Sequence, residues 1–567
     1  VPASSYVVSY DDAKKTMTIT FPDGLDQGVK INYDSQVTSP INGSVDLNNS
    51  VESDNKTTTA GGSVSEEGLT KSLGAVDYNA KTAAWNIDIN EGRQTMSDWV
   101  LNDTIPNGLT LDPSSFVLTD NDTKQTLVQG TDYQITETST GFKIEFLGAL
   151  KTSAKDYYTL TYKTSFDTNE VPSNGTWTNS AKATWTDVNG DTHENDGSAN
   201  FTPKVEFDND GSKSGSYNAT NKTITWTVVA NYNQRKLTDA TISDQIVGDQ
   251  DYVSDSAKLN EATINSDGSY SLGAQVSSPD ITFDSDSNTL TAKLPEGSTK
   301  AYVLTYETSL AGKVIDQSSY TNTAKYTNNS KEQDLTASVS VPNSGSFATK
   351  SGKQDPNDSA YADWNIIVNK SQSTLKDVVV TDQPSSNQIV DPDSIVIYGT
   401  TIDSNGNVTE NTADKLVEGT DYTVDLNTNQ TTGDQTLTIS FSNQISTAYS
   451  IDYKDLINSS LTNDTLSNTV SITGNGEKTV NQDVTSSTKV VNNGGSATGS
   501  NLNLVIQKNE QGTGKVIVGA EFALYSVSNG QKGQLLRTGT TDSNGQINWG
   551  NLKSGNYILV ETKAPDG

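Results

Sequence analysis

Three kinds of side chain that could react with one another recur at fixed spacings along this sequence of 567 residues. A lysine is followed 31 or 32 residues later by an aspartate, and an asparagine comes further along the chain. An amine, a carboxyl group and a carboxamide could together form an amide bond between two side chains, with the carboxyl group moving protons. The sets are Lys71, Asp103 and Asn179; Lys213, Asp244 and Asn322; and Lys350, Asp382 and Asn468.

The aspartates and asparagines lie in segments that alternate between apolar and polar residues like β-strands, and they occupy positions that are otherwise apolar. In the segment WTNSAKATW, Asn179 shares its phase with Trp177, and Asp103 shares the phase of Leu101. Because every second residue of a strand points to the same face, these polar side chains are expected to point into a core. The alternation that places a lysine among the apolar positions is clear at Lys71. It is weaker in the other two sets, where glycines lie nearby.

A dry core that holds all three groups permits one reaction in particular. Burial lowers the pKa of a lysine and raises that of an aspartate, and a neutral amine is a nucleophile. A protonated carboxyl group can polarise the carboxamide, and the fold keeps the reactants together. Attack of the amine on the carboxamide carbon, with loss of ammonia, would leave an intramolecular isopeptide bond. The expected bonds are Lys71–Asn179, Lys213–Asn322 and Lys350–Asn468, with Asp103, Asp244 and Asp382 as the catalytic acids.

A purely structural interpretation uses the same residues. An inward asparagine can simply hydrogen-bond the backbone at a bulge, and an inward aspartate can cap a loop, since buried polar groups are usually hydrogen-bonded. The recurrence of the same three residue types at matching positions in three repeats favours crosslinking over this interpretation.

The rest of the sequence predicts the elements that must position these groups. Threonine, serine, asparagine, aspartate and glycine dominate, and short alternating runs lie between turn residues. This pattern is typical of an all-β protein built of sandwiches. The asparagine of each set follows 15–17 residues after the last tyrosine of a strand such as YTLTYKT. A tryptophan followed five residues later by an asparagine also marks each repeat, at Trp85/Asn90, Trp226/Asn231 and Trp364/Asn369.

These repeats resemble the isopeptide-bonded β-sandwich domains of the collagen-adhesin type in Gram-positive surface proteins. In that family a lysine, an asparagine and a catalytic aspartate form such a bond, and the three sets match them. Near the start of the chain, VKINYDSQ with Tyr33, followed by Asn49 in LNNSV, matches only the end of such a repeat. We therefore interpret residues 1–66 as the C-terminal part of a truncated sandwich domain, with the partner of Asn49 before the start of this chain.

The end of the sequence resembles a different module. NLNLVIQKNE, GAEFALYSV and GNYILVETKAPDG are similar to the B-type, prealbumin-like domain of pilins and adhesin stalks. In that family the lysine bonds to an asparagine on the last strand, assisted by a glutamate. The resemblance implies these roles for Lys508 and Glu561, with the asparagine partner beyond the end of this chain.

Together these features predict tandem Ig-like and prealbumin-like β-sandwich domains arranged as an elongated array. The predicted segments are a truncated sandwich domain at 1–66, collagen-adhesin-type repeats at 67–203, 204–342 and 343–497, and a truncated prealbumin-like domain at 498–567.

Composition narrows the class of protein further. With 70 acidic against 38 basic residues, the net charge of −32 argues against nucleic acid and anionic membrane surfaces as partners. No apolar run approaches the ~20 residues of a membrane span. The chain has no cysteine and one histidine, so no thiolate metal site, no histidine triad and no cofactor are expected. Asp187, Asn189 and Asp191 alternate like calcium ligands, but such clusters are more often plain turns.

The expected function is mechanical and adhesive rather than enzymatic. We predict a segment of an extracellular bacterial surface protein, attached to the cell wall through a C-terminal region outside this chain, that projects or forms a host-attachment site. In the alternative interpretation, the domains themselves bind collagen, another extracellular-matrix protein or a glycan of the host. A secreted glycan-active enzyme is the least favoured interpretation, because no carboxylate pair is singled out.

Overall fold

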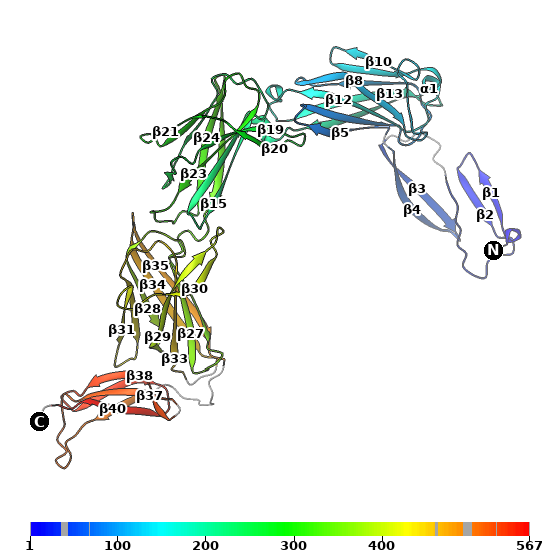
Figure 1. Ribbon diagram of the computed structural model, residues 1–567. Coiled ribbons are helices and arrows are strands. Elements are labelled where there is room, and N and C mark those ends of the chain that lie inside the picture. Colours follow the sequence, from blue (N-terminus) through cyan, green and yellow to red (C-terminus); the bar gives the residue numbers. More distant parts are fainter. Residues whose placement is uncertain are drawn as a thin grey trace. The chain divides into compact units, whose positions relative to one another are not determined.

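The computed structural model describes residues 2–35, 43–66, 68–459, 463–491, 502–528 and 530–565 (Figure 1). Nearly every element is a β-strand, which confirms the all-β class of tandem sandwiches. Val1–Pro203 and Lys204–Gly567 form two compact units. The expected domain boundaries at residue 67 and at residues 497–498 lie outside the described residues.

The first 66 residues contain two separate hairpins after a short 3-10 helix. Each hairpin is a two-stranded antiparallel sheet, and side chains such as Tyr10 and Val51 are exposed. The described part of this segment therefore has no buried core of its own. The elements are η1 (Ala3–Ser5), β1 (Val7–Asp11), β2 (Thr16–Thr20), β3 (Gly43–Ser53) and β4 (Lys56–Glu66).

Residues 69–201, called repeat 1, form two five-stranded antiparallel sheets that face one another (Figure 1). The strand orders are β5-β6-β12-β8-β9 and β10-β11-β7-β13-β14. The ring of Phe142 from one sheet packs edge-on against Tyr162 from the other, with centroids 4.9 Å apart, so the core lies between the sheets. The elements are β5 (Leu69–Asp77), β6 (Thr82–Ile89), β7 (Ser97–Thr104), β8 (Leu109–Asp120), β9 (Gln125–Thr126), β10 (Tyr133–Thr138), β11 (Gly141–Phe146), α1 (Gly148–Thr152), β12 (Tyr158–Phe166), η2 (Thr168–Glu170), β13 (Trp177–Thr186) and β14 (Thr192–Phe201).

Residues 211–340, called repeat 2, have the same arrangement of two sheets. One sheet has the order β15-β16-β23-β19-β20, with β18 also paired to β23, and the other has the order β21-β22-β17-β24-β25. The elements are α2 (Val205–Asp208), which precedes the repeat, β15 (Gly211–Asn218), β16 (Thr223–Ala230), β17 (Thr241–Gln245), β18 (Asp251–Tyr252), β19 (Lys258–Ile264), β20 (Tyr270–Gln275), β21 (Asp280–Asp284), β22 (Thr289–Lys293), β23 (Ala301–Ser309), β24 (Ser319–Asn328) and β25 (Lys331–Ser340).

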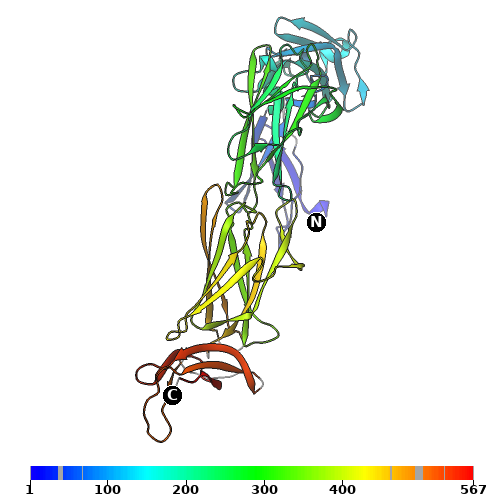
Figure 2. The same ribbon diagram turned by 60° about the vertical axis from the view of Figure 1, so that its left-hand side comes forward.

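Residues 348–489, called repeat 3, repeat the arrangement once more, and the two layers of strands are also visible after a turn of 60° (Figure 2). The strand orders are β26-β27-β33-β29-β30 and β31-β32-β28-β34-β35. The elements are β26 (Ala348–Gln354), β27 (Tyr361–Val368), β28 (Lys376–Pro384), β29 (Gln388–Ile402), β30 (Val408–Lys415), β31 (Tyr422–Thr428), β32 (Gln435–Phe441), β33 (Tyr449–Ile457), β34 (Thr465–Asn475) and β35 (Thr479–Lys489).

The asparagine that follows each marker tryptophan by five residues ends a strand in the left-handed conformation. Asn90, Asn231 and Asn369 have φ angles of 58°, 65° and 57°. Asparagine tolerates this region because its short polar side chain can hydrogen-bond locally. In each case Nδ2 donates to the carbonyl four residues later at 2.8 Å. The marker therefore ends a strand of one sheet and turns the chain toward the strand of the other sheet that carries the site aspartate.

The two strands that carry the aspartate and the asparagine pair in the same register in all three repeats. The residue opposite the aspartate lies two positions after the asparagine, so the two polar side chains share a face as diagonal neighbours. The opposed pairs are Asp103 and Ala181, Asp244 and Ala324, and Asp382 and Val470.

The C-terminal module, residues 502–565, has a different topology. A two-stranded sheet, β36-β39, packs with a three-stranded sheet, β38-β37-β40, around a small core that includes Phe522, Leu524 and Trp549. The strands are β36 (Leu502–Gln507), β37 (Glu521–Ser528), β38 (Gln531–Thr540), β39 (Gln546–Leu552) and β40 (Tyr557–Lys563).

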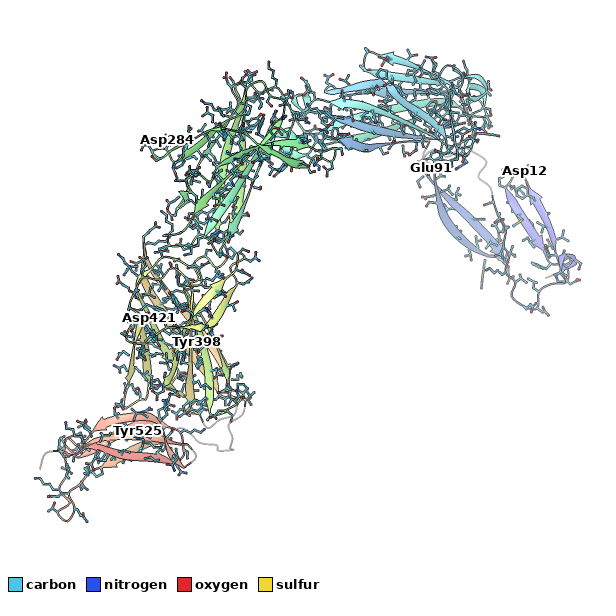
Figure 3. All side chains as sticks on the ribbon, in the orientation of Figure 1. Asp12, Glu91, Asp284, Tyr398, Asp421 and Tyr525 are labelled. Carbon is cyan, nitrogen blue, oxygen red and sulfur yellow. The ribbon has the colours of Figure 1, made fainter. Side chains whose placement is uncertain are left out.

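Acidic side chains are spread over the surface. Asp12, Glu91 and Asp284, for example, are exposed and project from the ribbon (Figure 3). Among the residues that the structure describes, no helix has the length and apolar character needed to cross a membrane.

Candidate functional site

Each sandwich brings its predicted lysine, aspartate and asparagine into the core between its two sheets. The lysine comes from the first strand of one sheet, which is β5, β15 or β26. The aspartate and the asparagine come from adjacent strands of the other sheet, which are β7 and β13, β17 and β24, or β28 and β34. The lysine and aspartate side chains are 0% exposed in all three repeats, and the asparagines are at most 1% exposed.

In repeat 1 the lysine contacts both of its expected partners. Lys71 Nζ lies 2.5 Å from Asp103 Oδ2 and 2.7 Å from Asn179 Oδ1. The amine is therefore hydrogen-bonded to the carboxamide that it would attack. Both contacts link the two sheets, because β5 belongs to one sheet and β7 and β13 to the other.

Repeats 2 and 3 contain the same contact between lysine and aspartate. Lys213 Nζ pairs with Asp244 Oδ2, and Lys350 Nζ lies 2.6 Å from Asp382 Oδ1. In both repeats the amine also donates to a tyrosine hydroxyl, at 3.2 Å for Tyr306 in repeat 2 and 2.5 Å for Tyr453 in repeat 3.

A tyrosine hydroxyl, which the sequence did not single out as a site group, joins the acid to the carboxamide in every repeat. The Tyr162 hydroxyl donates to Asp103 Oδ2 at 3.0 Å and accepts from Asn179 Nδ2 at 2.8 Å. The corresponding distances are 2.6 and 3.1 Å for Tyr306, and 2.5 and 2.8 Å for Tyr453. The signal in the sequence was the interval of 15–17 residues between this tyrosine and the asparagine.

The marker tryptophan lies beside the lysine in each repeat. The Nζ of Lys350 is 5.0 Å from the centroid of Trp364, and the distances in repeats 1 and 2 are 5.8 and 5.0 Å. A β-carbon on Gly352 would lie 2.3 Å from the Trp364 ring, and one on Gly215 would lie 2.8 Å from the Trp226 ring. The glycines that blur the lysine phase in repeats 2 and 3 are therefore needed to make room for the indole.

Burial shifts the pKa of the lysines and of one aspartate in the direction that amide formation requires. Burial lowers the pKa of Lys71 to about 8, against the attraction of Asp103, and it also lowers the pKa of Lys213 and Lys350. Burial raises the pKa of the Asp103 carboxyl group. A neutral amine beside a neutral acid differs from the ion pair only by one proton moved along one hydrogen bond. The amine can therefore become a nucleophile without exchanging a proton with water.

Several buried acceptor oxygens of the sites lack a hydrogen-bond donor among the described residues. They are Asp103 Oδ1, Asp244 Oδ1, Asn322 Oδ1 and Asn468 Oδ1. An unpaired buried acceptor costs about 1–3 kcal/mol. In repeat 2 the acid and the carboxamide each have one such oxygen, so among the described residues this site has fewer hydrogen-bond donors than acceptors.

The site of repeat 3 has a further buried acid near Asp382. Asp455, two residues after Tyr453 on β33, is 0% exposed, and neither of its oxygens has a hydrogen-bond partner in the part of the chain that the structure describes. The corresponding residues of the other repeats are Thr164 and Thr308, whose hydroxyls accept from the tryptophan indole at 3.0 and 3.1 Å. Burial and the nearby Asp382 carboxyl group raise the pKa of Asp455 well above its usual range.

We expect Asp455→Asn to change how the stability of repeat 3 depends on pH. In the unfolded chain this carboxyl group loses its proton near pH 4. In the folded repeat its pKa is raised, so wild-type stability is unaffected below about pH 4 and falls as the pH rises through the folded pKa. The asparagine does not titrate. The unfolding free energy of the variant should therefore gain on that of the wild type as the pH rises from 4 toward the folded pKa of Asp455, by up to about 1.4 kcal/mol for each pH unit.

Thermal melting of the full chain at pH 4, 6 and 8, with limited proteolysis to assign the transition of residues 348–489, measures this change. Asp425→Asn, at an exposed position of the same repeat, is the matched control and should show no such trend. An equal effect of Asp455→Asn at all three pH values would mean that the folded repeat does not hold Asp455 neutral.

In the C-terminal module the two residues assigned by resemblance lie together. Lys508 Nζ is 2.7 Å from Glu561 Oε2 and 5.8 Å from the ring centroid of Phe522. The two charged side chains are 29% and 31% exposed, in contrast to the closed sites of the three repeats. Water therefore reaches this pair.

Asn49 repeats part of the pattern in a different setting. Its Nδ2 donates to the hydroxyl of Tyr33, the same kind of pair that each repeat contains. Asn49 itself is exposed, as are Leu47 and Val51, in contrast to the inward position that their alternation indicated. The reason is that β3 pairs only with β4, and no second sheet of the described residues covers this hairpin.

The three residues that alternate like calcium ligands lie in a tight turn. Asp187 Oδ1 accepts the backbone N–H groups of Asn189 and Asp191 at 2.8 and 2.9 Å, and its Oδ2 lies 3.1 Å from His193 Nε2. Within the described ranges, no group of three or more histidine, cysteine, aspartate or glutamate side chains is arranged to hold a metal ion.

Comparison with protein families agrees with the two kinds of module. The collagen binding domain family matches residues 66–196, 208–336 and 345–484, which together are well over half of the chain. The chain belongs to the collagen binding domain family. The prealbumin-like fold domain family matches residues 502–567. The resemblance to collagen-adhesin-type repeats followed by a prealbumin-like domain is thereby confirmed.

Solved structures of similar proteins include bacterial adhesins. The collagen binding subdomain of the Enterococcus faecalis surface protein ACE is 14% identical, covers 25% of this chain and 99% of its own, and gives a TM-score of 0.22. The collagen adhesin of S. aureus is 16% identical, covers 48% of this chain and 91% of its own, and gives a TM-score of 0.19. The C-terminal domain of Streptococcus agalactiae BspA is 11% identical, covers 48% of this chain and 99% of its own, and gives a TM-score of 0.22. Scores this low carry no argument, and the assignment rests on the family match.

No curated protein matches the sequence. Collagen binding domains of this type imply an extracellular surface protein with an adhesive role, and both matching families are of the binding type rather than enzymes.

Proposed function

We propose that each repeat joins its lysine to its asparagine in an intramolecular isopeptide bond, and that the crosslinked repeats form the adhesive stalk of a bacterial surface protein. The observation that carries the proposal is the recurrence, in three repeats, of a buried amine in contact with a buried carboxyl group beside a buried carboxamide. The bonds would be Lys71–Asn179, Lys213–Asn322 and Lys350–Asn468, with Asp103, Asp244 and Asp382 as the acid–base groups.

The reaction needs no external reagent. The lysine ammonium group gives one proton to the aspartate and attacks the carboxamide carbon as a neutral amine. The carbon–nitrogen bond of the carboxamide breaks, the nitrogen leaves with one added proton as ammonia, and the lysine nitrogen loses its second proton. An ion pair and a carboxamide thus become an amide, a neutral carboxyl group and ammonia, so that atoms and charge balance.

The position of the bond explains its mechanical value. Lys71 lies in the first strand of repeat 1 and Asn179 in the last strand but one, 108 positions further along the sequence. A bond between these side chains would carry tension directly from one end of the repeat to the other. The intervening chain, about 360 Å when fully extended, could not be pulled out.

Intact-mass measurement of the purified full chain tests the proposal. The mass should fall below that calculated from the sequence by three ammonia molecules, one for each set. Peptide mapping should find the three joined lysine–asparagine pairs. A mass equal to that of the unmodified sequence would contradict the proposal for all three repeats.

A second candidate function is that the repeats themselves bind collagen or another matrix protein or glycan of the host. It is favoured by the family match alone, because the family is named for collagen binding. Retention of the full chain on immobilised collagen, compared with immobilised albumin, discriminates between a repeat that holds a ligand and one that serves only as a spacer.

The remaining parts of the proposal concern the whole protein. We place the domain boundaries at 66/67, 203/204, 342/343 and 497/498, near the limits of the family matches. Attachment to a Gram-positive cell wall would come from a region C-terminal to this chain. Lys508 and Glu561 would form the corresponding site of the prealbumin-like module, and Asn49 that of the first segment, each with a partner outside this chain.

A further inference from the structure

The hydroxyl group between the acid and the carboxamide is the most regular feature of the three sites that the proposed reaction does not yet use. Tyr162, Tyr306 and Tyr453 each donate to the aspartate and accept from the asparagine nitrogen. The pair of tyrosine and asparagine also occurs at Tyr33 and Asn49.

The nitrogen that contacts the tyrosine is the leaving group of the proposed reaction. In a carboxamide this nitrogen cannot accept a proton readily, because its lone pair is delocalised into the carbonyl group, and so it donates to the tyrosine oxygen. After the lysine attacks, the carbon becomes tetrahedral and the nitrogen becomes an ordinary amine that accepts hydrogen bonds. It must then gain a proton before the carbon–nitrogen bond can break.

In repeats 2 and 3 the tyrosine forms a bridge between the proton source and this nitrogen. Tyr306 lies 2.6 Å from Asp244 Oδ2 and 3.1 Å from Asn322 Nδ2. Tyr453 lies 2.5 Å from Asp382 Oδ2 and 2.8 Å from Asn468 Nδ2. Each aspartate also accepts a hydrogen bond from the lysine. The acid therefore contacts the nucleophile directly, and it is linked to the leaving nitrogen through the tyrosine.

We propose that this tyrosine relays a proton from the aspartate to the departing nitrogen, which makes it a third catalytic residue of isopeptide formation. The inference rests on the proposed function. The carboxyl proton, received from the lysine, moves to the tyrosine oxygen while the tyrosine proton moves to the nitrogen, and ammonia leaves. The aspartate then takes the second lysine proton, so the tyrosine ends as it began and the aspartate ends neutral.

The relay is a transition-state interaction rather than a binding interaction. The direction of both tyrosine hydrogen bonds reverses only after the carboxamide has been attacked, so the contribution is greatest where the bond breaks. Burial and the neighbouring carboxyl group raise the pKa of Tyr162 and Tyr306, so the hydroxyl stays neutral and can both accept and donate.

Tyr306→Phe in the full chain tests the relay, because it removes one oxygen and keeps the buried ring. During cell-free synthesis, mass spectrometry of peptides at successive times measures how fast each repeat becomes joined. We expect the Lys213–Asn322 bond to form about 10²-fold more slowly, a typical contribution of a positioned proton donor. The bonds in repeats 1 and 3 of the same molecule should form at the wild-type rate and serve as internal references.

Tyr302→Phe is the matched control. Tyr302 lies on the same strand, is buried, and donates to Ser298 at 2.9 Å rather than to the site. It should leave all three rates unchanged. Measuring the rates in heavy water adds a readout that packing alone would not move: the isotope effect on repeat 2 should differ between the wild type and Tyr306→Phe.

The outcomes separate this inference from the proposed function. If the wild type forms three bonds and Tyr306→Phe forms the second equally fast, the relay is overturned and the crosslinking stands. If the wild type forms none, the proposed function itself fails. If repeat 2 of the variant is protease-sensitive before any bond forms, Tyr162→Phe and Tyr453→Phe decide the matter in the other two repeats.

Discussion

Replacing Asp244 by alanine is expected to leave Lys213 and Asn322 unjoined while the bonds in repeats 1 and 3 still form. Asp244 is the only carboxyl group that hydrogen-bonds Lys213 among the described residues, and each repeat carries its own acid. Without it the buried amine has no carboxylate to take its proton, and the carboxamide loses its acid. A general acid–base group contributes about 10²–10⁴-fold in rate. The intact mass should show two lost ammonia molecules instead of the three expected for the wild type.

Two further variants make this result specific. Asp244→Asn keeps the volume of the side chain but cannot accept the lysine proton as a carboxylate does, so it should also block the bond. Asp334→Ala removes an exposed carboxyl group from the same repeat, opposite Lys325 on the edge strand, and should leave all three bonds intact. Peptide mapping that still finds Lys213 joined to Asn322 in both Asp244 variants would remove this residue from the catalytic role.

Replacing Lys71 by alanine is expected to lower the stability of repeat 1 more than any exposed substitution in the same repeat. The bond would close a loop of 108 residues. By analogy with a disulfide, closing ~100 residues restricts the unfolded chain and so stabilises the folded repeat by about 4–5 kcal/mol. This is a large part of the 5–15 kcal/mol that stabilises a typical domain. For a domain of this size the melting temperature should fall by roughly 10–20 °C.

Hydrogen exchange measured peptide by peptide during heating of the full chain would locate the loss. Peptides from residues 69–201 should exchange at lower temperature and become open to trypsin. Lys163→Ala is the matched control, because Lys163 is exposed on β12 of the same repeat, and it should melt like the wild type. The alanine also leaves Asp103 without its amine partner and with only the Tyr162 hydroxyl as a donor, so part of the loss comes from a buried acid that has lost a hydrogen bond.

Asn179→Ala separates these two contributions. It prevents the same bond but leaves the contact of Lys71 with Asp103 in place, so the loss that both variants share estimates the effect of the bond itself. If both variants matched the wild type in melting temperature and trypsin resistance, the crosslink would contribute nothing to the resting stability of repeat 1. The stalk proposal would then lose its main physical support.

Much of the fold and of the reactive sets could be predicted because strand periodicity is a local property. The alternation around Asn179 and around Asp103 shows which face of each strand is buried, and a polar residue in that phase stands out without any knowledge of the partner strand. The repeats made the lysines predictable as well. A lysine at nearly the same interval before each aspartate indicates that the three lysines occupy the same position in three copies of one fold.

The same reasoning failed where a residue's neighbours lie on another sheet. Tyr162, Tyr306 and Tyr453 looked like ordinary core aromatics, because alternation reports burial and not what the hydroxyl meets across the sandwich. The glycines at Gly215 and Gly352 seemed to weaken the lysine phase, yet the structure shows that they lie against an indole ring. The sequence carries no signal for Asp455, because the equivalent threonines of the other repeats make its position look merely polar.

The sequence by itself thus determined which side chains of the three repeats share one face of a strand and which residue types recur, because side chains alternate between the two faces with a period of two along the chain. Only the tertiary structure decided which buried groups touch. The lysine and the tyrosine come from one sheet and the aspartate and the asparagine from the other, and the register and facing of two sheets depend on how whole layers pack. The order acid, hydroxyl, carboxamide, on which the proposed proton path depends, therefore exists only in the folded sandwich.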